Sequence, residues 1–314
     1  MTTQPMSLPT HAADSTEATA QSQKGFWVIV SLLTVYIVWG TTYLAVHFAL
    51  ASFPPYLLLG IRFVIAGLIL LGVLVAAGSP LPTFKQWRNA GIVGAFILVG
   101  GTGSVVLGQE RSVSSGLAAT LVATVPIWTM IFNLYWGKRP TRWEWLGVGL
   151  GICGVALLTM EGNLQSNPIG VLIILFAAAS WAFGSVLSPH LDMPKGLMAN
   201  ATEMLLAGLM FLVFSVLRGE SMVAEPNVQT LLALTYLITF GSLAGMSAYI
   251  YLLGNVSSLL ATSYTFVNPA IALFLGVILG GEVITGSAFL ALPLILAGVG
   301  FVAYQNRFVG KKKI

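Results

Sequence analysis

Long apolar runs alternate with short polar segments along this chain, from about residue 26 to residue 306. Each run holds roughly 20 residues, the length at which a helix rising about 1.5 Å per residue crosses the hydrocarbon core of a bilayer. Strands of a membrane barrel would instead alternate with period two over short segments, and the sequence has no such pattern. The chain is therefore predicted to be an all-α integral membrane protein with ten transmembrane helices. Their centres lie near Tyr36, Ala66, Val99, Thr124, Cys153, Ala179, Gly208, Phe240, Ala270 and Ile295.

The composition agrees with this interpretation. Hydrophobic residues make up 57% of the chain and charged residues 8%, whereas an ordinary soluble domain carries about 25% charged residues. The net charge of +4 is spread over the segments between the runs and over the chain ends, so it does not indicate nucleic-acid binding. Residues 1–24 are polar and are expected to form a disordered cytosolic tail, and residues 307–314 a basic cytosolic tail. The single cysteine, Cys153, excludes an intramolecular disulfide.

Lysine and arginine are concentrated in the segments that a ten-helix topology places on one side of the membrane. Eleven of the fourteen fall there, while Arg111 and Arg218 fall on the other side and Arg62 falls within a helix. Positive residues are enriched in cytoplasmic loops. Both termini are therefore expected to be cytosolic.

Two stretches in the two halves of the chain are similar in sequence. Residues 114–126 read SSGLAATLVATVP, and residues 257–269 read SSLLATSYTFVNP. With five helices in each half, an odd number, the second half must enter the membrane from the opposite side. The halves, residues 25–162 and 163–306, are therefore predicted to be inverted five-helix repeats of one membrane domain, an arrangement typical of secondary transporters with a central site.

Each of these stretches ends in a proline, Pro126 or Pro269, near the middle of an apolar run. A proline inside a helix lacks an N–H and leaves the carbonyl four residues earlier, that of Val122 or Thr265, without its usual partner. In lipid such a carbonyl must face protein or a wet cavity. The two prolines are predicted to be hinges in the walls of a central cavity, and a plain proline kink is the alternative.

Aromatic and polar residues within the runs are candidates for binding a substrate. Trp39 and Trp181 lie too deep in their runs for the interfacial aromatic belt, and Tyr43 shares a helix face with Trp39. Tyr264 lies one turn before Asn268. Together they suggest an aromatic cavity with hydroxyl groups, suited to amphipathic organic molecules, although each could also serve only in packing. The substrate-binding candidates are Trp39, Tyr43, His47, Thr120, Trp181, Ser185, Tyr264 and Asn268.

Arg62 and Glu203 are the only cation and the only carboxylate deep within a run, and they occupy corresponding places in the two halves. Ionisable groups are costly in a membrane and are functional candidates for that reason. Glu203 could bind protons or a substrate amine, and Arg62 a carboxylate; the two are candidates for coupling or for a structural ion pair. Since each lies only about two turns from a membrane face, snorkelling or a purely structural role is the alternative.

Other classes of protein lack their characteristic residues here. The three histidines are scattered and the one cysteine lies mid-run, so neither a metal site nor a nucleophilic centre is indicated. We expect no cofactor, no metal and no enzymatic activity, with an integral membrane enzyme as the less favoured alternative. Gly147, Gly151 and Gly154 form a small-residue face typical of close helix packing. That face is compatible with a monomer or a weak homodimer.

Several of these features resemble the EamA type of the drug/metabolite transporter superfamily. They are Trp39-Gly40 in the first run, Arg62-Phe63 with Ala66-Gly67 in the second, and the doubled SSxLA…P stretch. Within the superfamily the chain is most similar to the YddG-type exporters of aromatic amino acids from bacterial inner membranes. The resemblance implies two inverted five-helix repeats around a cavity lined by helices one, three, four, six, eight and nine. Family members often carry an acidic residue just after helix four, where this chain has Lys138 and Arg139.

Residues and resemblance together predict a secondary transporter of a bacterial inner membrane. It is expected to export amino acids, neutral or aromatic, or related amphipathic metabolites by alternating access through a central cavity. An exporter of organic cations or multiple drugs with the same architecture is the alternative.

Overall fold

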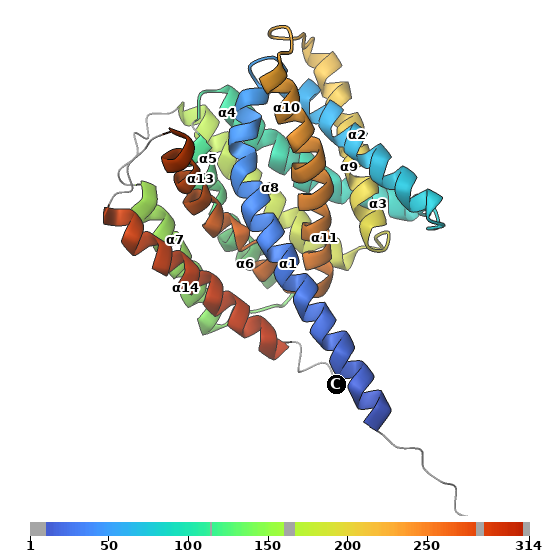
Figure 1. Cartoon of the computed structure of the whole chain (residues 1–314), viewed down its shortest axis with the longest axis vertical. Coiled ribbons are helices and arrows are strands. Elements are labelled where there is room, and N and C mark those ends of the chain that lie inside the picture. The colour runs from blue at the N-terminus through green and yellow to red at the C-terminus, as the bar shows by residue number, and fades with distance from the viewer. Residues whose placement is uncertain (1–10, 114, 160–166, 281–285, 310–314) are drawn as a thin grey trace, which may run out of the picture.

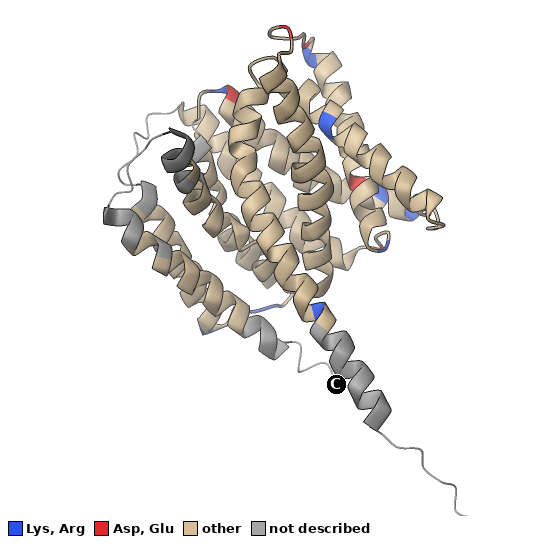
Figure 2. Cartoon of the chain, viewed as in Figure 1, with Lys and Arg blue, Asp and Glu red and all other residues tan. Residues whose placement is uncertain are grey.

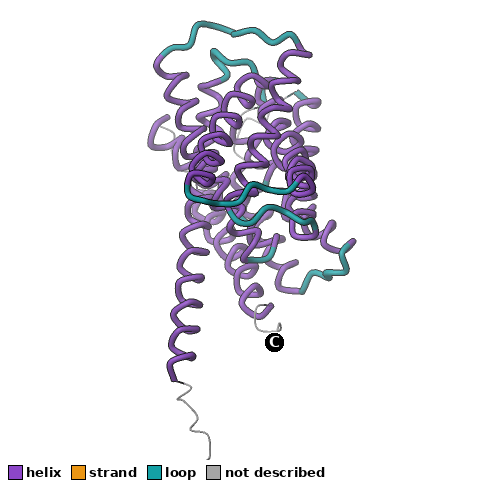
Figure 3. Tube along the Cα trace, turned by 90° about the vertical axis from the view of Figure 1, so that its right-hand side faces the viewer, coloured by secondary structure: helices purple, strands orange, loops and turns teal. Residues whose placement is uncertain are grey.

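The computed structural model describes residues 11–113, 115–159, 167–280 and 286–309, and over these residues it consists of helices and turns without strands. Figure 3 shows long helices joined by short loops. Figure 2 shows most of the charged residues near the helix ends and loops, and an uncharged bundle between them. Such a distribution suits a body that is embedded in lipid.

The helices follow one another without intervening domains (Figure 1). In the first half they are α1 (His11–Ala49), α2 (Pro55–Ala76), α3 (Phe84–Gly94), η1 (Ala95–Gly103), α4 (Ser104–Glu110), α5 (Ser115–Val122), α6 (Val125–Tyr135) and α7 (Arg142–Thr159). In the second half they are α8 (Pro168–Leu187), η2 (Ser188–His190), α9 (Leu197–Arg218), α10 (Val228–Tyr236), η3 (Leu237–Ala244), α11 (Gly245–Asn255), α12 (Ser258–Ala261), α13 (Tyr264–Gly280) and α14 (Gly286–Val309).

Seven helical segments among the described residues are long and apolar enough to cross a membrane. Two of them, 84–110 and 228–255, are continuous rods in which the π-helical turns η1 and η3 lie between α-helical ends. The other predicted crossings fall on α7, α12 with α13, and α14, which do not reach that threshold over their described residues. The chain is thus a multi-pass helical protein, and the count of ten stays a prediction. The predicted repeat boundary at residue 162 and the outer ends of both tails lie outside the described residues.

Helix α1 begins earlier than expected. It starts at His11, so residues 11–24, which were expected to be disordered, continue the helix beyond the bundle (Figure 1). The apolar part of this helix begins only at Gln23. The polar extension contains four alanines and two glutamines, which favour helix once a membrane-spanning segment has supplied the nucleus.

Glycines bring two helix pairs into close contact. A methyl group added at Gly67 of α2 would lie 2.7 Å from the backbone nitrogen of Leu205 on α9, and one at Gly208 of α9 would lie 2.6 Å from that of Val64 on α2. The pair α7 and α14, side by side in Figure 1, shows the same reciprocity, since Gly147 and Gly298 each face the other's carbonyl oxygen. Small residues at such contacts let backbones approach in membrane bundles. Each pair is self-complementary in the way that a two-fold axis requires.

The two stretches of similar sequence both form broken helices. The chain turns at Ala123 and Thr124 between α5 and α6, and again at Thr262 and Ser263 between α12 and α13. Pro126 is the second residue of α6, so it starts a helix rather than interrupting one as predicted. At that position a proline costs no helical hydrogen bond. Pro269 does lie inside α13, as predicted.

Candidate functional site

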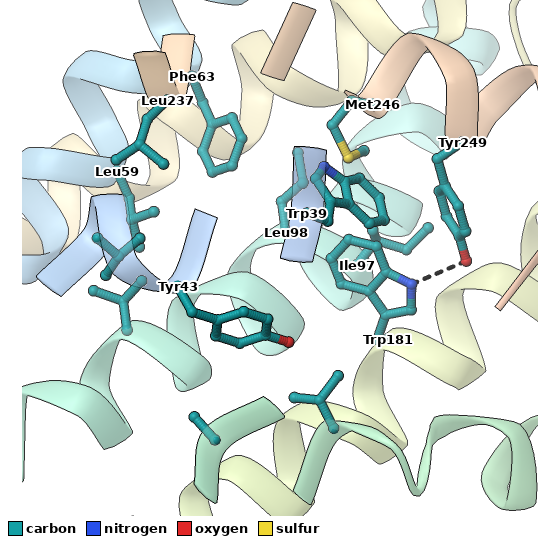
Figure 4. Packing of buried hydrophobic residues seen from close by; sticks show 14 of the residues in the cluster. Trp39, Tyr43, Leu59, Phe63, Ile97, Leu98, Trp181, Leu237, Met246 and Tyr249 are labelled. Atoms are coloured by element: carbon teal, nitrogen blue, oxygen red, sulfur yellow. Dashed lines mark hydrogen bonds between the residues drawn. The ribbon is translucent and has the colours of Figure 1, made fainter. Parts of the chain in front are cut away.

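Four aromatic side chains from four helices meet in the middle of the bundle. The ring of Trp39 on α1 lies 5.3 Å from Trp181 on α8, 5.2 Å from Tyr249 on α11 and 4.7 Å from Tyr264 on α13, measured between centroids. Edge-to-face and tilted pairs at about 4.5–7 Å are favourable because a ring edge is positive and a ring face negative. Figure 4 shows Trp39, Trp181 and Tyr249 side by side, with the hydroxyl of Tyr43 directed toward the same space. We call Trp39, Trp181, Tyr249 and Tyr264 the aromatic cluster.

Hydrogen bonds fix the orientation of both indoles. The Nε1–H of Trp39 donates to the carbonyl oxygen of Gly241 at 3.0 Å, and that of Trp181 donates to the Tyr249 hydroxyl at 2.9 Å. Ser185 donates to the carbonyl of Trp181 at 2.7 Å and lies 2.6 Å from the Tyr249 hydroxyl. Because Ser185 has one proton to give, Tyr249 must be the donor in their shared bond. The result is a closed ring of three hydrogen bonds that holds Trp181.

Two glycines make room for the indoles. Gly101 in η1 faces Trp181, where an added methyl group would lie 2.7 Å from Cε3, and Gly245 at the start of α11 faces the Trp39 ring in the same way. Gly101 lies inside the last part of η1, and Gly245 directly follows η3 in the other half of the chain. Each tryptophan is therefore seated against the opposite half of the chain.

An open cavity of about 670 Å³, including the part that opens to solvent, lies against the aromatic cluster. Along α1 its lining extends from Trp39 to Val46, and along η1 and α4 from Gly101 to Gln109, toward the ends of α1 and α4. Helices from both halves of the chain contribute. The lining is mostly apolar, and its side chains that can form hydrogen bonds are Trp39, Thr42, Tyr43, Arg62, Thr102, Gln109, Trp181, Tyr264 and Asn268.

Arg62 on α2 is a buried cation in the wall of this cavity. Its Nε–H donates to the hydroxyl of Ser242 in η3 at 2.8 Å, and its guanidinium carbon lies 4.8 Å from the centre of the Phe63 ring. The sequence predicted a functional or structural role for Arg62 but not its position in the cavity wall, because its partner Ser242 is far away in the chain.

Asn268 on α13 faces the cavity from another side, since α13 and α2 lie on opposite sides of α1 in Figure 1. Its side chain is 1% exposed. The hydroxyl of Tyr43 approaches the amide, but no contact from the described residues to either amide atom has hydrogen-bond geometry. Asn268 therefore retains a donor and an acceptor for a ligand.

The structure brings together most, but not all, of the predicted substrate-binding residues. Trp39, Tyr43, Trp181, Tyr264 and Asn268 line the cavity. The remaining three, His47, Thr120 and Ser185, are not among the residues that line the cavity. The cavity therefore does not support their assignment as binding residues. His47 is exposed in the last turn of α1 beside Phe48, and it follows Val46, the last residue of α1 that lines the cavity. Thr120 lies on α5, and Ser185 supports Trp181 from behind.

Glu203 on α9 is completely buried and does not line the cavity. Among the described residues neither carboxyl oxygen has a hydrogen-bond partner, and the possible ion pair with Arg62 is not formed. The reason is geometric: α2 and α9 pack together, but Arg62 faces η3 while the backbone of Glu203 packs against Gly94 at the end of α3. The carboxyl is close enough to Tyr249 to act on it electrostatically.

Tyr249 and Ser242 are the residues that the sequence analysis missed. Both are central to the site, one as the hydrogen-bond acceptor of Trp181 and the other as the partner of Arg62. The glycines at 101 and 245, in corresponding runs, are the signal that could have located the contacts of the indoles. Among the described residues, no three of His, Cys, Asp and Glu come together as a metal site would require.

Comparison with known proteins shows which family the chain belongs to. The chain matches the EamA-like transporter family over residues 26–160 and again over residues 168–304. It is 41% identical over 272 residues to the inner membrane transporter YedA of Escherichia coli strain K12, covering 87% of this chain and 89% of that protein. It is 25% identical over 280 residues to a probable amino-acid metabolite efflux pump of Salmonella typhimurium strain LT2, covering 85% and 91%. A solved crystal structure with 20% sequence identity superposes with a TM-score of 0.73 over 90% of this chain and 98% of that chain, a likeness of fold.

Proposed function

The chain belongs to the EamA-like transporter family, and on that premise we propose that it is a secondary transporter that exports amino acids. Neutral and aromatic amino acids, or amphipathic metabolites of similar size, are the proposed substrates. A relative of similar length is described as a probable amino-acid metabolite efflux pump. The proposed location is a bacterial inner membrane, with both termini in the cytosol.

The central cavity is the observation that carries this proposal. It lies between helices of both halves, and the aromatic cluster bounds it at one end. Aromatic and aliphatic walls bind the apolar part of a substrate, while Arg62 and Asn268 offer polar groups for its head. A lining of this kind, apolar with a few placed polar groups, is typical of sites for small organic molecules.

The ten-helix inverted repeat is part of the same proposal. Three features of the two halves support it: the family matches the chain twice, both halves contain a π-helical rod, and both contain a broken helix. The reciprocal glycine contacts of α2 with α9 and of α7 with α14 are those expected at a pseudo-two-fold axis.

In this account the two repeats rock against each other around the cavity. With cytosolic termini, the end of α1 at Ala49 faces outward, so the cavity lies on the outer side of the aromatic cluster. The cluster then separates the substrate from the cytosol, and the opposite state opens a path by parting Trp39 from Trp181. Pro126 and Pro269 lie in the walls that move and are the proposed hinges.

Membrane vesicles test the proposal. Vesicles loaded with labelled L-phenylalanine should lose it faster when they contain the protein, and the released compound should be chemically unchanged. Trp39→Ala and Trp181→Ala should each slow efflux about tenfold or more, because each removes a wall of the site. Trp145→Ala, in an exposed position on α7, is the matched control and should export normally. Equal efflux from all variants, at equal amounts of inserted protein, would contradict the assignment of the site.

A further inference from the structure

We propose that Arg62 is a specificity-determining residue that binds the carboxylate group of the exported substrate. The inference rests on the proposed function and narrows it to substrates that carry a carboxylate. It begins from a single feature, a positive charge in the cavity wall that forms no ion pair with any acidic residue in the described part of the chain.

The ion pairs of the described residues leave Arg62 out. They join Lys85 to Asp192, and Arg218 to Glu110 and Glu220, and none of these residues lines the cavity. Glu203, the corresponding acid in the other half, forms no hydrogen bond or ion pair with Arg62 or with any other described residue. An arginine that is 5% exposed has given up most of its hydration, a cost that a counter-charge normally offsets. No Asp or Glu is among the described residues that line the cavity, so a ligand is the group that can supply the counter-charge.

The guanidinium is also oriented for this task. Its Nε–H donates a hydrogen bond to Ser242, and Ser242 is itself fully buried. This bond fixes the plane of the guanidinium group. The two terminal nitrogens form no hydrogen bond with any described residue. Gly241 lies against one of them, where a side chain would come within 2.9 Å of Nη2. A planar fork with free N–H groups matches a carboxylate in bidentate geometry, which an ammonium group cannot reproduce.

The rest of the cavity complements a carboxylate-bearing molecule with an apolar body. Phe63, Trp39 and Met246 provide apolar surface near the arginine, and Asn268 offers its amide from another side of the cavity. The same charge works against organic cations, because placing a second positive charge beside Arg62 in a poorly hydrated cavity is unfavourable. In this cavity Arg62 therefore favours substrates that carry a carboxylate over organic cations.

Two pairs of probes that differ only in the charged group test this inference. L-phenylalanine and L-phenylalaninamide share the ring and the ammonium group, and 3-phenylpropionate and 3-phenylpropionamide share the ring alone. In proteoliposomes we expect the wild type to exchange phenylalanine at least about tenfold faster than its amide, as the loss of a charged hydrogen bond implies. Arg62→Gln should remove most of this preference by slowing phenylalanine selectively, and Arg62→Lys should retain part of it. Arg88→Gln, an exposed arginine on α3, is the matched control and should behave like the wild type.

A second measurement separates this inference from the proposed function. The melting temperature of the purified protein should rise with 3-phenylpropionate but not with its amide, and Arg62→Gln should abolish the rise, because only a ligand of the native state stabilises it. A wild type that binds the carboxylate in this way but exchanges no amino acid would contradict the proposed function and leave the Arg62 site standing. The inference would be overturned if the wild type exchanged phenylalanine and its amide at equal rates. It would also be overturned if Arg62→Gln slowed the exchange of both compounds equally. Export of amino acids could still hold in either case.

Discussion

Replacing Gly208 or Gly67 by alanine should force α2 and α9 apart. The added methyl group at Gly67 would lie 2.7 Å from the backbone nitrogen of Leu205, whereas ordinary contacts begin at 3.4 Å, so the helices must separate locally by about 0.7 Å. Backbone atoms cannot turn aside as a side chain can. Overpacking of this kind costs about 1–3 kcal/mol, which exceeds the roughly 1 kcal/mol that alanine gains over glycine as a helix former. Gly67→Ala and Gly208→Ala should therefore each lower the melting temperature of the detergent-purified protein.

Gly72→Ala provides the matched control, because Gly72 lies on the same helix with no atom near its missing side chain. That variant should melt at the wild-type temperature or above it. The melting temperature of the double variant Gly67→Ala with Gly208→Ala should fall by less than the sum of the two single decreases. One separation of α2 from α9 relieves both contacts. Equal melting temperatures for Gly67→Ala and Gly72→Ala would refute the close packing from which the two-fold relation is argued.

Three further predictions concern the site and its movement. Tyr249→Phe should destabilise the protein by about 1–3 kcal/mol, measured by melting, because it leaves the buried N–H of Trp181 without an acceptor; a neutral effect would contradict the hydrogen-bonded ring. Glu203→Gln should leave folding intact and remove any dependence of phenylalanine efflux on a pH gradient; an unchanged dependence would exclude this carboxyl from coupling. Pro269→Ala should slow exchange several-fold with the same binding of phenylalanine, since it stiffens α13 by restoring a helical hydrogen bond; unaltered exchange would contradict the hinge.

Periodicity and composition were sufficient to predict the helical membrane fold, because lipid admits few alternatives to apolar helices of fixed length. The deep aromatic residues Trp39, Trp181 and Tyr264, which were expected in the wall of a cavity, line one in the structure for a related reason, and their role in substrate binding stays a prediction. An indole in the middle of an apolar run must satisfy its N–H inside the protein, so it marks the inner face of its helix.

Contacts between distant helices could not be predicted in this way. Whether Arg62 meets Glu203 or Ser242 depends on the rotation of α2 against α9 and η3, which a single sequence does not determine. The position of His47 could not be predicted either, because its neighbour Val46 lines the cavity while His47 itself is exposed. The role of Pro126 could not be predicted because the sequence does not reveal that the helix breaks at Ala123 and Thr124. That break places Pro126 at the start of α6 instead of inside a helix.

The central claim is that the cavity opens to water on one side of the membrane and holds the substrate. In a Cys153→Ser background, which removes the one native thiol, a cysteine can be placed at Thr102, in the cavity wall on η1. A membrane-impermeant maleimide should label the Thr102→Cys variant from one side of the membrane, and L-phenylalanine should slow that labelling. Thr239→Cys, in the corresponding segment η3 but on the exposed surface of the bundle, should remain unlabelled in lipid. A cysteine at position 102 that does not react, or that reacts at the same rate with and without phenylalanine, would contradict the account.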